Sequence, residues 1–417
     1  MKVLKFGGTS VGSAQRMKDV AKLITDGEQK IVVLSAMSGT TNTLVEISDY
    51  LYKKNPEGAN EIINRLEAKY KQHIDELYST EEYKQKTLDF VKSVFDYIRS
   101  YTKDIFTLFE EKVILAQGEI ISTNMVTNYL CEQGVNATLI PALEYMRTDK
   151  NSEPDLTYIR EKLSAQLEAN PDYEIYITQG FICRNAYGEI DNLQRGGSDY
   201  TASLIGAAIN ASEIQIWTDI DGMHDNDPRV VDKTSPVRQL HFEEAAELAY
   251  FGAKILHPTC IQPAKYANIP VRLLNTMEPT APGTLISNDT EKGKIKAVAA
   301  KDNITAIKIK SSRMLLAHGF LRKVFEIFES YQTPIDMVCT SEVGVSMSID
   351  NTKHLNEIVN DLKKYGTVTV DHDMCIVCVV GDLEWENVGF EAKALDAMRE
   401  IPVRMISFGG SNYNILS

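Results

Sequence analysis

The stretch KVLKFGGTS, residues 2–10, decides the fold. Residues 3–6 form a short apolar strand that contains Lys5, a Gly-Gly pair follows, and a helical pattern then runs over 13–24. A strand that leads through a glycine turn into a helix is the repeating unit of α/β proteins. Residues 30–36, KIVVLSA, form a second and almost wholly apolar strand, which is typical of a parallel sheet covered on both faces.

Strand and helix patterns alternate over the first 300 residues, which predicts an α/β fold with a mostly parallel sheet. Further strands are expected at 137–140, 174–179, 214–217 and 270–274, and helices near 115–133, 155–168, 199–210, 242–251 and 259–266. Between 56 and 110, apolar residues recur every three or four positions, with a break near 79–80. This stretch predicts two amphipathic helices that leave the sheet. We expect a packing insert that caps the sheet edge, with a lid or an interface as the alternative.

The pattern changes after residue 295. A strand at 304–309, a helix at 319–330, strands at 335–340 and 343–349, a helix at 352–364 and a strand at 366–371 predict a βαββαβ unit. Part of this unit repeats at an offset of 68 residues, because PIDMV at 334–338 matches PVRMI at 402–406. The second copy stops before its last helix and strand, so strand 295–300 is expected to complete its sheet. The predicted domains are 1–294 and 295–417, with the first copy (about 301–372) inserted in the second (about 295–300 plus 373–417).

The composition is that of a soluble globular protein, with 417 residues, of which 43% are hydrophobic and 24% charged. The 44 Lys and Arg against 58 Asp and Glu give a formal charge of −14, which argues against a nucleic-acid partner. No apolar stretch reaches a membrane-spanning length and the start lacks a signal peptide, so no membrane association and a cytoplasmic location are expected. Six scattered cysteines argue against a disulfide framework, and the odd spacing of Cys375 and Cys378 predicts opposite faces of a strand.

Two glycine turns that precede helices carry candidate chemistry. Lys5 lies just before Gly7 and Gly8, where backbone N–H groups and a helix N-terminus can approach an anion. The second turn, RGGSD at 195–199, places an arginine suited to a carboxylate or phosphate beside a glycine pair. For Ser198 and Asp199 in that turn, the alternative is a plain helix cap.

An acidic loop and a second lysine add to these turns. The loop TDIDGMHDNDPR, 218–229, follows a strand, as nucleotide-binding loops do, and lacks the register of an EF-hand. Lys254 in GAKILHP, 252–258, is a candidate phosphate contact, whereas His257 before a proline is interpreted as structural. Glu119 lies in an apolar helix, where a carboxylate meets an ammonium or caps the helix. With only seven histidines and no zinc spacing, neither a histidine base nor a metal-ligand set is predicted.

The segments KFGGTSVG, LAQGE, TQGF, RGGSDYTA, TDIDG…DPR and GAKILHP occur in the order and at the distances found in aspartate kinases. The whole chain therefore resembles this family of the amino acid kinase superfamily, including a C-terminal ACT pair that ends in SFGGSNYNIL. It looks more like the monofunctional lysine-sensitive branch, or the kinase half of the bifunctional enzymes, than the branch that makes a separate small subunit. The resemblance implies a three-layer αβα sandwich with a mostly parallel sheet, plus two ferredoxin-like ACT domains. It also implies an ATP- and Mg²⁺-dependent kinase that phosphorylates the β-carboxylate of L-aspartate, giving 4-phospho-L-aspartate, the first step of lysine, threonine and methionine biosynthesis.

The resemblance further implies roles for single residues, with Lys5 on the transferring phosphoryl group and Asp199 organising that lysine. The aspartate pocket would comprise Thr41, Glu119, Phe181, Arg195 and Ser198, with Arg195 on the α-carboxylate. The nucleotide contacts would be Gly7, Gly8, Ser10, Thr218, Asp219, Gly222, His224, Asp227, Arg229, Lys254 and Ile255. An end-product amino acid, with lysine and threonine as candidates, would contact Met314, Phe320, Leu321, Asp336, Ser341 and Glu342. A homodimer or homotetramer through the ACT domains is expected.

Four positions depart from the family pattern. His224 stands where the family commonly has tyrosine, and Asp221 replaces a neutral residue. Ala317 and Pro334 stand where the lysine-sensitive branch has small hydroxyl residues, which leaves the effector open.

Several alternatives stay open. Phe320 and Leu321 would be plain core residues if no effector binds.

An aspartate carboxylate is ionised at pH 7 and needs no general base, in agreement with the scarcity of histidine. The alternative functions are another carboxylate kinase, such as one acting on glutamate, or a non-catalytic amino-acid sensor; the intact Lys5, Asp199 and Lys254 argue against the sensor.

Overall fold

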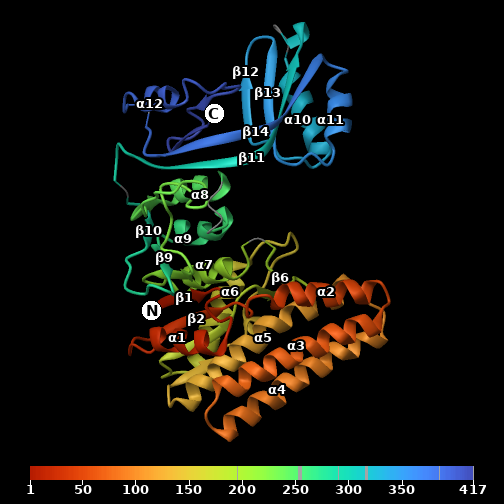
Figure 1. Ribbon diagram of the computed structural model, residues 1–417, viewed down its shortest axis with the longest axis vertical. Coiled ribbons are helices and arrows are strands. Elements are labelled where there is room, and N and C mark those ends of the chain that lie inside the picture. The colour runs from red at the N-terminus through yellow and green to blue at the C-terminus, as the bar shows by residue number, and fades with distance from the viewer. Residues whose placement is uncertain (195, 252–255, 290, 315–317, 385, 417) are drawn as a thin grey trace. The chain divides into compact units, whose positions relative to one another are not determined.

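The computed structural model describes residues 1–194, 196–251, 256–289, 291–314, 318–384 and 386–416 (Figure 1). The chain divides into two compact units. The first comprises Met1–Met223, Arg238–Phe242 and Ile255–Thr290, and the second His224–Val237, Glu243–Lys254 and Glu291–Ser417. Each unit has its own sheet.

The first unit is built on an eight-stranded sheet with the order β3-β4-β2-β1-β7-β9-β10-β8. Its strands are β1 (Lys2–Phe6), β2 (Lys30–Leu34), β3 (Ala137–Leu139), β4 (Ile175–Gln179), β7 (Ile214–Thr218), β8 (Gln239–His241), β9 (Val271–Asn275) and β10 (Thr284–Ser287). The strands from β3 to β9 in this order are parallel, and β10 is antiparallel to β9. The mostly parallel sheet is confirmed, and all of β2 is buried, as its apolar sequence predicts. A small hairpin of β5 (Ile182–Arg184) and β6 (Ile190–Asn192), which the sequence did not predict, follows β4.

Helices cover both faces of this sheet (Figure 1). One face carries α1 (Ala14–Ile24), α2 (Thr40–Tyr52) and α5 (Leu108–Glu132), and the other carries α6 (Leu156–Ala169), α7 (Gly197–Ile209) and α9 (Gln262–Tyr266). The three-layer αβα arrangement is therefore confirmed. Helix α5 begins well before the predicted residue 115, because Thr107 and Glu110 form a capping box at its start.

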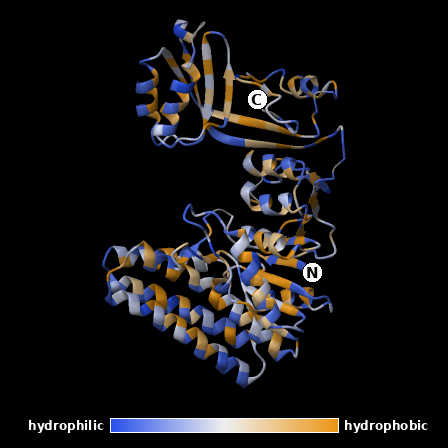
Figure 2. Ribbon diagram, turned by 180° about the vertical axis from the view of Figure 1, so that it is seen from behind, coloured by the Kyte–Doolittle hydropathy of each residue, from blue (hydrophilic) through white to orange (hydrophobic). Residues whose placement is uncertain are grey.

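The two amphipathic helices between 56 and 110 are confirmed as α3 (Pro56–Leu77) and α4 (Glu81–Ser100). They do not cap an edge of the sheet, so that expectation is wrong. Helix α3 packs on α1 and α2, and α4 packs on α5, so the pair thickens the helical layer on one face (Figure 1). Their apolar stripes join the core of that layer, and each helix shows one hydrophobic and one hydrophilic face (Figure 2).

The second unit holds a six-stranded antiparallel sheet with the order β12-β13-β11-β14-β16-β15. Its strands are β11 (Ile295–Lys310), β12 (Met337–Thr340), β13 (Gly344–Ile349), β14 (Thr367–Gly381), β15 (Ser407–Phe408) and β16 (Asn414–Leu416). Its helices include α8 (Phe242–Phe251), α10 (Phe320–Ser330), α11 (Leu355–Leu362) and α12 (Phe390–Ala397). The βαββαβ order predicted for the first copy is confirmed.

The long strands β11 and β14 serve both halves of this sheet. Residues 304–310 of β11 pair with 367–374 of β14 beside β13, and residues 295–301 pair with 376–381 beside β16. Residues 402–406, which match 334–338 in the repeat, form no strand, and β15 (Ser407–Phe408) begins directly after them. Pro402 has no N–H for a ladder, and β16 is only three residues long, so little pairing is offered there.

Cys375 is exposed and Cys378 is buried along β14, as the odd spacing predicts, and both are free thiols. Among the described helices, none has the length and apolar character to cross a membrane.

Candidate active site

A buried ion pair lies at the carboxyl edge of the first sheet. The carboxyl ends of β1, β2, β4 and β7 lie side by side there, which is where α/β folds bind ligands. Nζ of Lys5, near the end of β1, is 2.8 Å from Oδ1 of Asp199 in the first turn of α7. The side chains are 11% and 15% exposed. The pair fixes the lysine ammonium at the edge, because a charge in such a sheltered place needs a partner.

The helix-cap alternative for Ser198 and Asp199 is wrong. Helix α7 is capped by Gly196 in the left-handed conformation, with φ of 69°, and no side chain caps it. The Oγ of Ser198 instead accepts a hydrogen bond of 2.9 Å from Oγ of Ser35, which follows β2. Ser198 and Asp199, in the first turn of α7, thus contact Ser35 after β2 and Lys5 of β1.

The Gly-Gly turn after β1 is packed closely against the segment after β2. A Cβ on Gly8 would lie 2.9 Å from the backbone oxygen of Ala36, so only glycine fits there. The Ser38 N–H donates to the Gly8 oxygen at 3.1 Å and holds the two segments together. Gly7 lies next to the lysine, since a Cβ there would be 3.4 Å from Nζ of Lys5.

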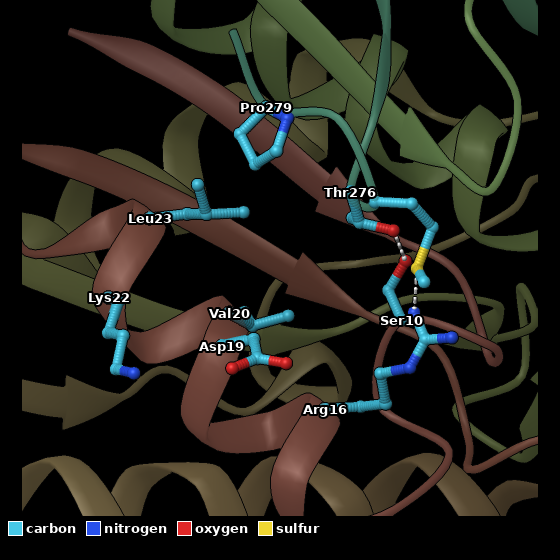
Figure 3. Close-up of a pocket in the computed structure, with 9 residues that line it drawn as sticks. Ser10, Arg16, Asp19, Val20, Lys22, Leu23, Thr276 and Pro279 are labelled. Atoms are coloured by element: carbon cyan, nitrogen blue, oxygen red, sulfur yellow. Dashed lines mark hydrogen bonds between the residues drawn. The ribbon is translucent and has the colours of Figure 1, made fainter.

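Ser10, a predicted nucleotide contact, is buried beside Thr276. Its Oγ donates to Oγ1 of Thr276 at 3.3 Å, and the residue is 1% exposed. On this side of the turn, a cavity of about 300 Å³ is lined by Ser10, Thr276, Arg16 and Lys22, among others (Figure 3). Lys5 is not among the residues that line this cavity.

Glu119 is a buried carboxylate with one oxygen unused. It lies on α5, is 3% exposed, and accepts at Oε1 a hydrogen bond of 3.4 Å from the Ala36 N–H. Its Oε2 is buried and has no hydrogen-bond partner among the described residues. Burial raises the pKa of Glu119 to about 8. A site of this kind is suited to an ammonium group, which would supply both a counter-charge and a donor.

Phe181 and Thr41, the other described residues of the predicted aspartate pocket, lie at the same edge. Phe181 follows β4 with a φ of 71°, a strained value for a bulky residue, and its N–H donates to Oγ1 of Thr201 at 2.9 Å. Thr41 lies in the first turn of α2 and is half-buried. Arg195, Lys254 and Ile255 lie outside the described residues.

The predicted nucleotide residues fall in both units. In the first unit, Thr218 ends β7 and its backbone oxygen accepts from Oγ1 of Thr276 at 2.9 Å. Asp219 is exposed, and Gly222 precedes Met223, whose N–H donates to a threonine at 2.9 Å. Asp221 is 3.3 Å from Nη1 of Arg238, so this departure from the family pattern has a partner of its own.

In the second unit, Nδ1 of His224 is 2.8 Å from Oγ1 of Thr234. Arg229 and Asp227 pair through both carboxylate oxygens, at 3.0 Å from Nε and 2.6 Å from Nη2. The His224 ring therefore has a hydrogen-bond partner, and the arginine is oriented by the aspartate.

The predicted effector residues lie around α10 and β12 of the second unit. Phe320 is 8% exposed and belongs to the core of α10 and α11, whereas Leu321 is 36% exposed. Met314 packs against that core, Ser341 forms the β12–β13 turn by donating from its N–H to the Gly344 oxygen at 2.8 Å, and Glu342 is exposed.

Asp336 is the buried member of this set. Its side chain is 1% exposed; Lys301 lies 3.3 Å from its Oδ1, and Tyr250 donates a hydrogen bond of 2.7 Å to the same atom. Lys301 also pairs with Asp350 at 2.9 Å and lies 4.5 Å from the centre of the Tyr250 ring. Oδ2 of Asp336 is buried without a partner among the described residues.

Comparisons with known proteins identify the family of this chain. The profile of the amino acid kinase family matches residues 1–275. Aspartokinase 1, chloroplastic, of Arabidopsis thaliana is 35% identical over 436 residues, covering 99% of this chain and 76% of that protein. The lysine-sensitive aspartokinase 3 of Escherichia coli (strain K12) is 31% identical over 426 residues, covering 99% and 94%. The chain belongs to the aspartokinases of the amino acid kinase family.

Solved aspartokinases share the fold of the whole chain. The structure of E. coli aspartokinase III with aspartate and ADP, an R-state, matches with a TM-score of 0.82 at 31% identity, covering 100% of this chain and 95% of that one. The same enzyme with lysine and aspartate, a T-state, matches with a TM-score of 0.81. The aspartate kinase of Clostridium acetobutylicum matches with 0.86 at 26% identity and the same coverage.

Sequence reasoning missed several residues that complete these sites. Ser35 contacts Ser198, and the Ala36 N–H contacts Glu119. The polar Ser35 after an apolar strand was a usable signal, whereas Ala36 carried none. Lys301 and Tyr250 had no such signal, because they are far from Asp336 in the sequence and only the fold brings them together.

Proposed function

We propose that this aspartokinase transfers the γ-phosphoryl group of ATP to the β-carboxylate of L-aspartate, giving 4-phospho-L-aspartate. The observation that carries this proposal is the sheltered ion pair of Lys5 and Asp199, set against a Gly-Gly turn at the carboxyl edge of the sheet. The nucleophile is already ionised, so the site must bring two anions together rather than remove a proton. Ammonium and backbone N–H groups at this edge serve that need.

Each described residue has a task in this reaction. Glu119 accepts the substrate ammonium at its unused oxygen, while Ser198, Thr41 and Phe181 enclose the rest of the amino acid. Lys5 neutralises charge on the transferring phosphoryl group, and Asp199 holds its ammonium in place between turnovers. Arg195, by its sequence position before the α7 turn, would take the α-carboxylate.

The nucleotide would follow the ends of β1 and β7, where Gly7, Gly8, Thr218 and Asp219 lie. Mg²⁺ typically binds one or two carboxylates, waters and substrate phosphates rather than a cage of protein ligands. Within the described ranges, no cluster of three His, Cys, Asp or Glu could hold a metal, and no described residue pairs with the exposed Asp219 carboxylate. Asp219 therefore fits a Mg²⁺ that is bound mainly by ATP. That ion would screen the phosphate charge.

An assay of acyl-phosphate formation tests the activity. With ATP, L-aspartate and hydroxylamine, we expect aspartyl hydroxamate, and with L-glutamate in its place little product. Lys5→Ala should lower turnover at least a hundredfold, since one electrostatic contact to a transition state contributes about that much. Lys2→Ala is the matched control, because Lys2 lies on the same strand but pairs with the exposed Glu28 at 3.2 Å. Formation of glutamyl hydroxamate alone would favour the alternative carboxylate kinase, and no product with either acid would overturn the proposal.

The same proposal extends to regulation and assembly. We place a catalytic domain at 1–294 and two ACT domains at 295–417, the first (301–372) inserted in the second. The way β11 and β14 each contribute to both halves of one sheet supports this division. The lysine-bound T-state of the E. coli enzyme supports an amino-acid effector near Asp336, with lysine and threonine as candidates.

Pairing of ACT domains between subunits would give a homodimer or homotetramer. Strand β12 ends the sheet and exposes Val338, which supports an interface at that edge. Rates measured with lysine, threonine and methionine, together with light scattering, test both points. A monomer unaffected by all three amino acids would contradict them.

A further inference from the structure

A buried tyrosine hydroxyl on the helical insert points to a link with the aspartate pocket. Tyr70 lies on α3, is 1% exposed, and belongs to a helix face that is otherwise almost entirely apolar. Its ring packs against Phe95 of α4, with the ring centres 5.9 Å apart. A hydroxyl buried among apolar groups is costly unless it is hydrogen-bonded. Phenylalanine would fill this place equally well if packing were the whole purpose.

The partner of that hydroxyl is the first residue of α2. The Tyr70 hydroxyl is 2.7 Å from Oγ1 of Thr40, which is itself 1% exposed. Helix α2 begins after Gly39 in the left-handed conformation and has no side-chain cap, so this contact is what fixes its first side chain. The next residue along the helix is Thr41, which belongs to the proposed aspartate pocket.

The segment 35–41, which ends at these threonines, contacts most of the proposed site. Ser35 donates to Ser198, the Ala36 N–H donates to Glu119, and the Ser38 N–H donates to the Gly8 oxygen. Thr40 closes the segment against α5, since a Cβ on Gly118, which precedes Glu119, would lie 3.3 Å from Cγ2 of Thr40. Burial raises the pKa of the Tyr70 hydroxyl, and the nearby Glu119 carboxylate adds to this rise. The tyrosine thus supports one end of a segment that carries the substrate contacts.

We propose that Tyr70 is a positioning residue of the aspartate pocket. Acting through Thr40, it holds the first turn of α2 so that Thr41 and the Ala36 N–H keep the geometry that aspartate requires. The helical insert of α3 and α4 is then a support of the acceptor site and not only a packing layer. This inference rests on the proposed activity, and it assigns Tyr70 to aspartate binding and not to ATP binding or to the chemical step.

Tyr70→Phe tests the proposal because it removes one oxygen and leaves the ring in place. We expect KM for aspartate to rise about fivefold, as for the loss of one buried hydrogen bond, with kcat and KM for ATP changed less than twofold. Tyr78→Phe is the matched control. Tyr78 follows the same helix and is equally sheltered, but its hydroxyl donates to the Met125 backbone oxygen at 2.6 Å, away from segment 35–41.

A double variant tests whether the effect passes through Thr40. Thr40→Val alone should raise KM for aspartate to a similar extent, and adding Tyr70→Phe should raise it no further. Thermal unfolding of each variant separates loss of fold from loss of positioning, and Thr40→Val carries the test if Tyr70→Phe does not fold. Unchanged KM for aspartate despite a lowered Tm would overturn the proposal, as would equal rises in both KM values. Absence of any turnover in the wild-type enzyme would instead overturn the proposed function.

Discussion

The buried Glu119 carboxylate makes a quantitative prediction about aspartate binding. With a pKa raised to about 8 by burial, it is mostly protonated at pH 7 in the free enzyme. Pairing with a substrate ammonium requires the ionised form, which costs about 1.4 kcal/mol at pH 7, one pKa unit below the midpoint. We therefore expect kcat/KM for aspartate to rise about 50-fold from pH 6 to pH 8 and then to level off. Aspartate binding at pH 7 should release about 0.9 proton, which calorimetry in buffers of different ionisation enthalpy measures.

Glu119→Gln removes the titrating group and is nearly isosteric. We expect this variant to bind aspartate more weakly and to show less than a threefold change in kcat/KM across the same pH range. Glu67→Gln is the control, because Glu67 is also buried but its carboxylate is paired with Arg99 and Lys71. That variant should keep the wild-type pH profile.

The same group predicts a pH-dependent stability that needs no substrate. The folded protein binds the Glu119 proton more tightly than the unfolded chain, whose pKa is near 4.5, so stability falls as the pH rises from about 4.5 to about 8. Between pH 6 and pH 8 this amounts to about 2 kcal/mol of unfolding free energy, which Glu119→Gln should not lose. Urea unfolding at the two pH values measures the difference. Equal losses in the wild type and the variant, together with a flat kcat/KM profile in the wild type, would refute the reasoning.

Three further predictions concern residues outside the aspartate pocket. Lys301→Met leaves Asp336 buried without its ammonium and should cost about 3 kcal/mol in urea unfolding, so wild-type stability would contradict the ion pair. Gly8→Ala forces the turn away from a backbone oxygen 2.9 Å from the added methyl and should lower kcat/KM for ATP at least tenfold. Gly410→Ala, where nothing lies within 4 Å, should match the wild type in that assay, and equal behaviour of the two variants would contradict the close packing. Tyr250→Phe removes a donor to Asp336 and should shift the effector concentration for half-maximal response by about fivefold in rate titrations, without changing the uninhibited rate. An unshifted response would separate Tyr250 from regulation.

The sheet of the first unit could be predicted because each strand carries its own signal. Residues 31–34 are apolar and buried, so sequence and environment agree at each of these four positions, and Lys30 is the one buried charge of the strand. The start of α5 was missed because the polar capping box at Thr107 and Glu110 precedes the apolar run that marks the helix. Residues 402–406, which match 334–338 in the repeat, form no strand, and the reason is the opposite one. The segment has apolar residues, but a strand forms only where a neighbouring strand offers backbone hydrogen bonds. That neighbour is the short β16, which the local sequence pattern does not describe.

The site also contains residues that the sequence marked and residues that it did not. Lys5 and Asp199 were each marked by a local glycine turn, and the parallel sheet then brings them within 2.8 Å. Nothing in the sequence around Tyr70 distinguishes it from the apolar residues of the same helix face, since a tyrosine can pack in a core or form a hydrogen bond through its hydroxyl. Its partner Thr40 lies thirty positions away on another helix. Contacts of this kind depend on how helices pack, and a single sequence does not record that packing.

The charges of the described site suggest why an acidic chain can bind two anionic substrates. Lys5 and Asp199 form a neutral pair, and Glu119 is largely protonated at pH 7, so this part of the free site holds little net charge. Each proposed substrate carries a charge opposite to that of one group in the site. In the proposed reaction, the ammonium of aspartate would displace the Glu119 proton, and the phosphates of ATP would compete with Asp199 for the Lys5 ammonium. Buried charges that are balanced before and after binding avoid the cost of an isolated ion at either stage. The formal charge of −14 on the whole chain therefore does not prevent the proposed reaction, because substrate binding depends on the local charges at the sheet edge.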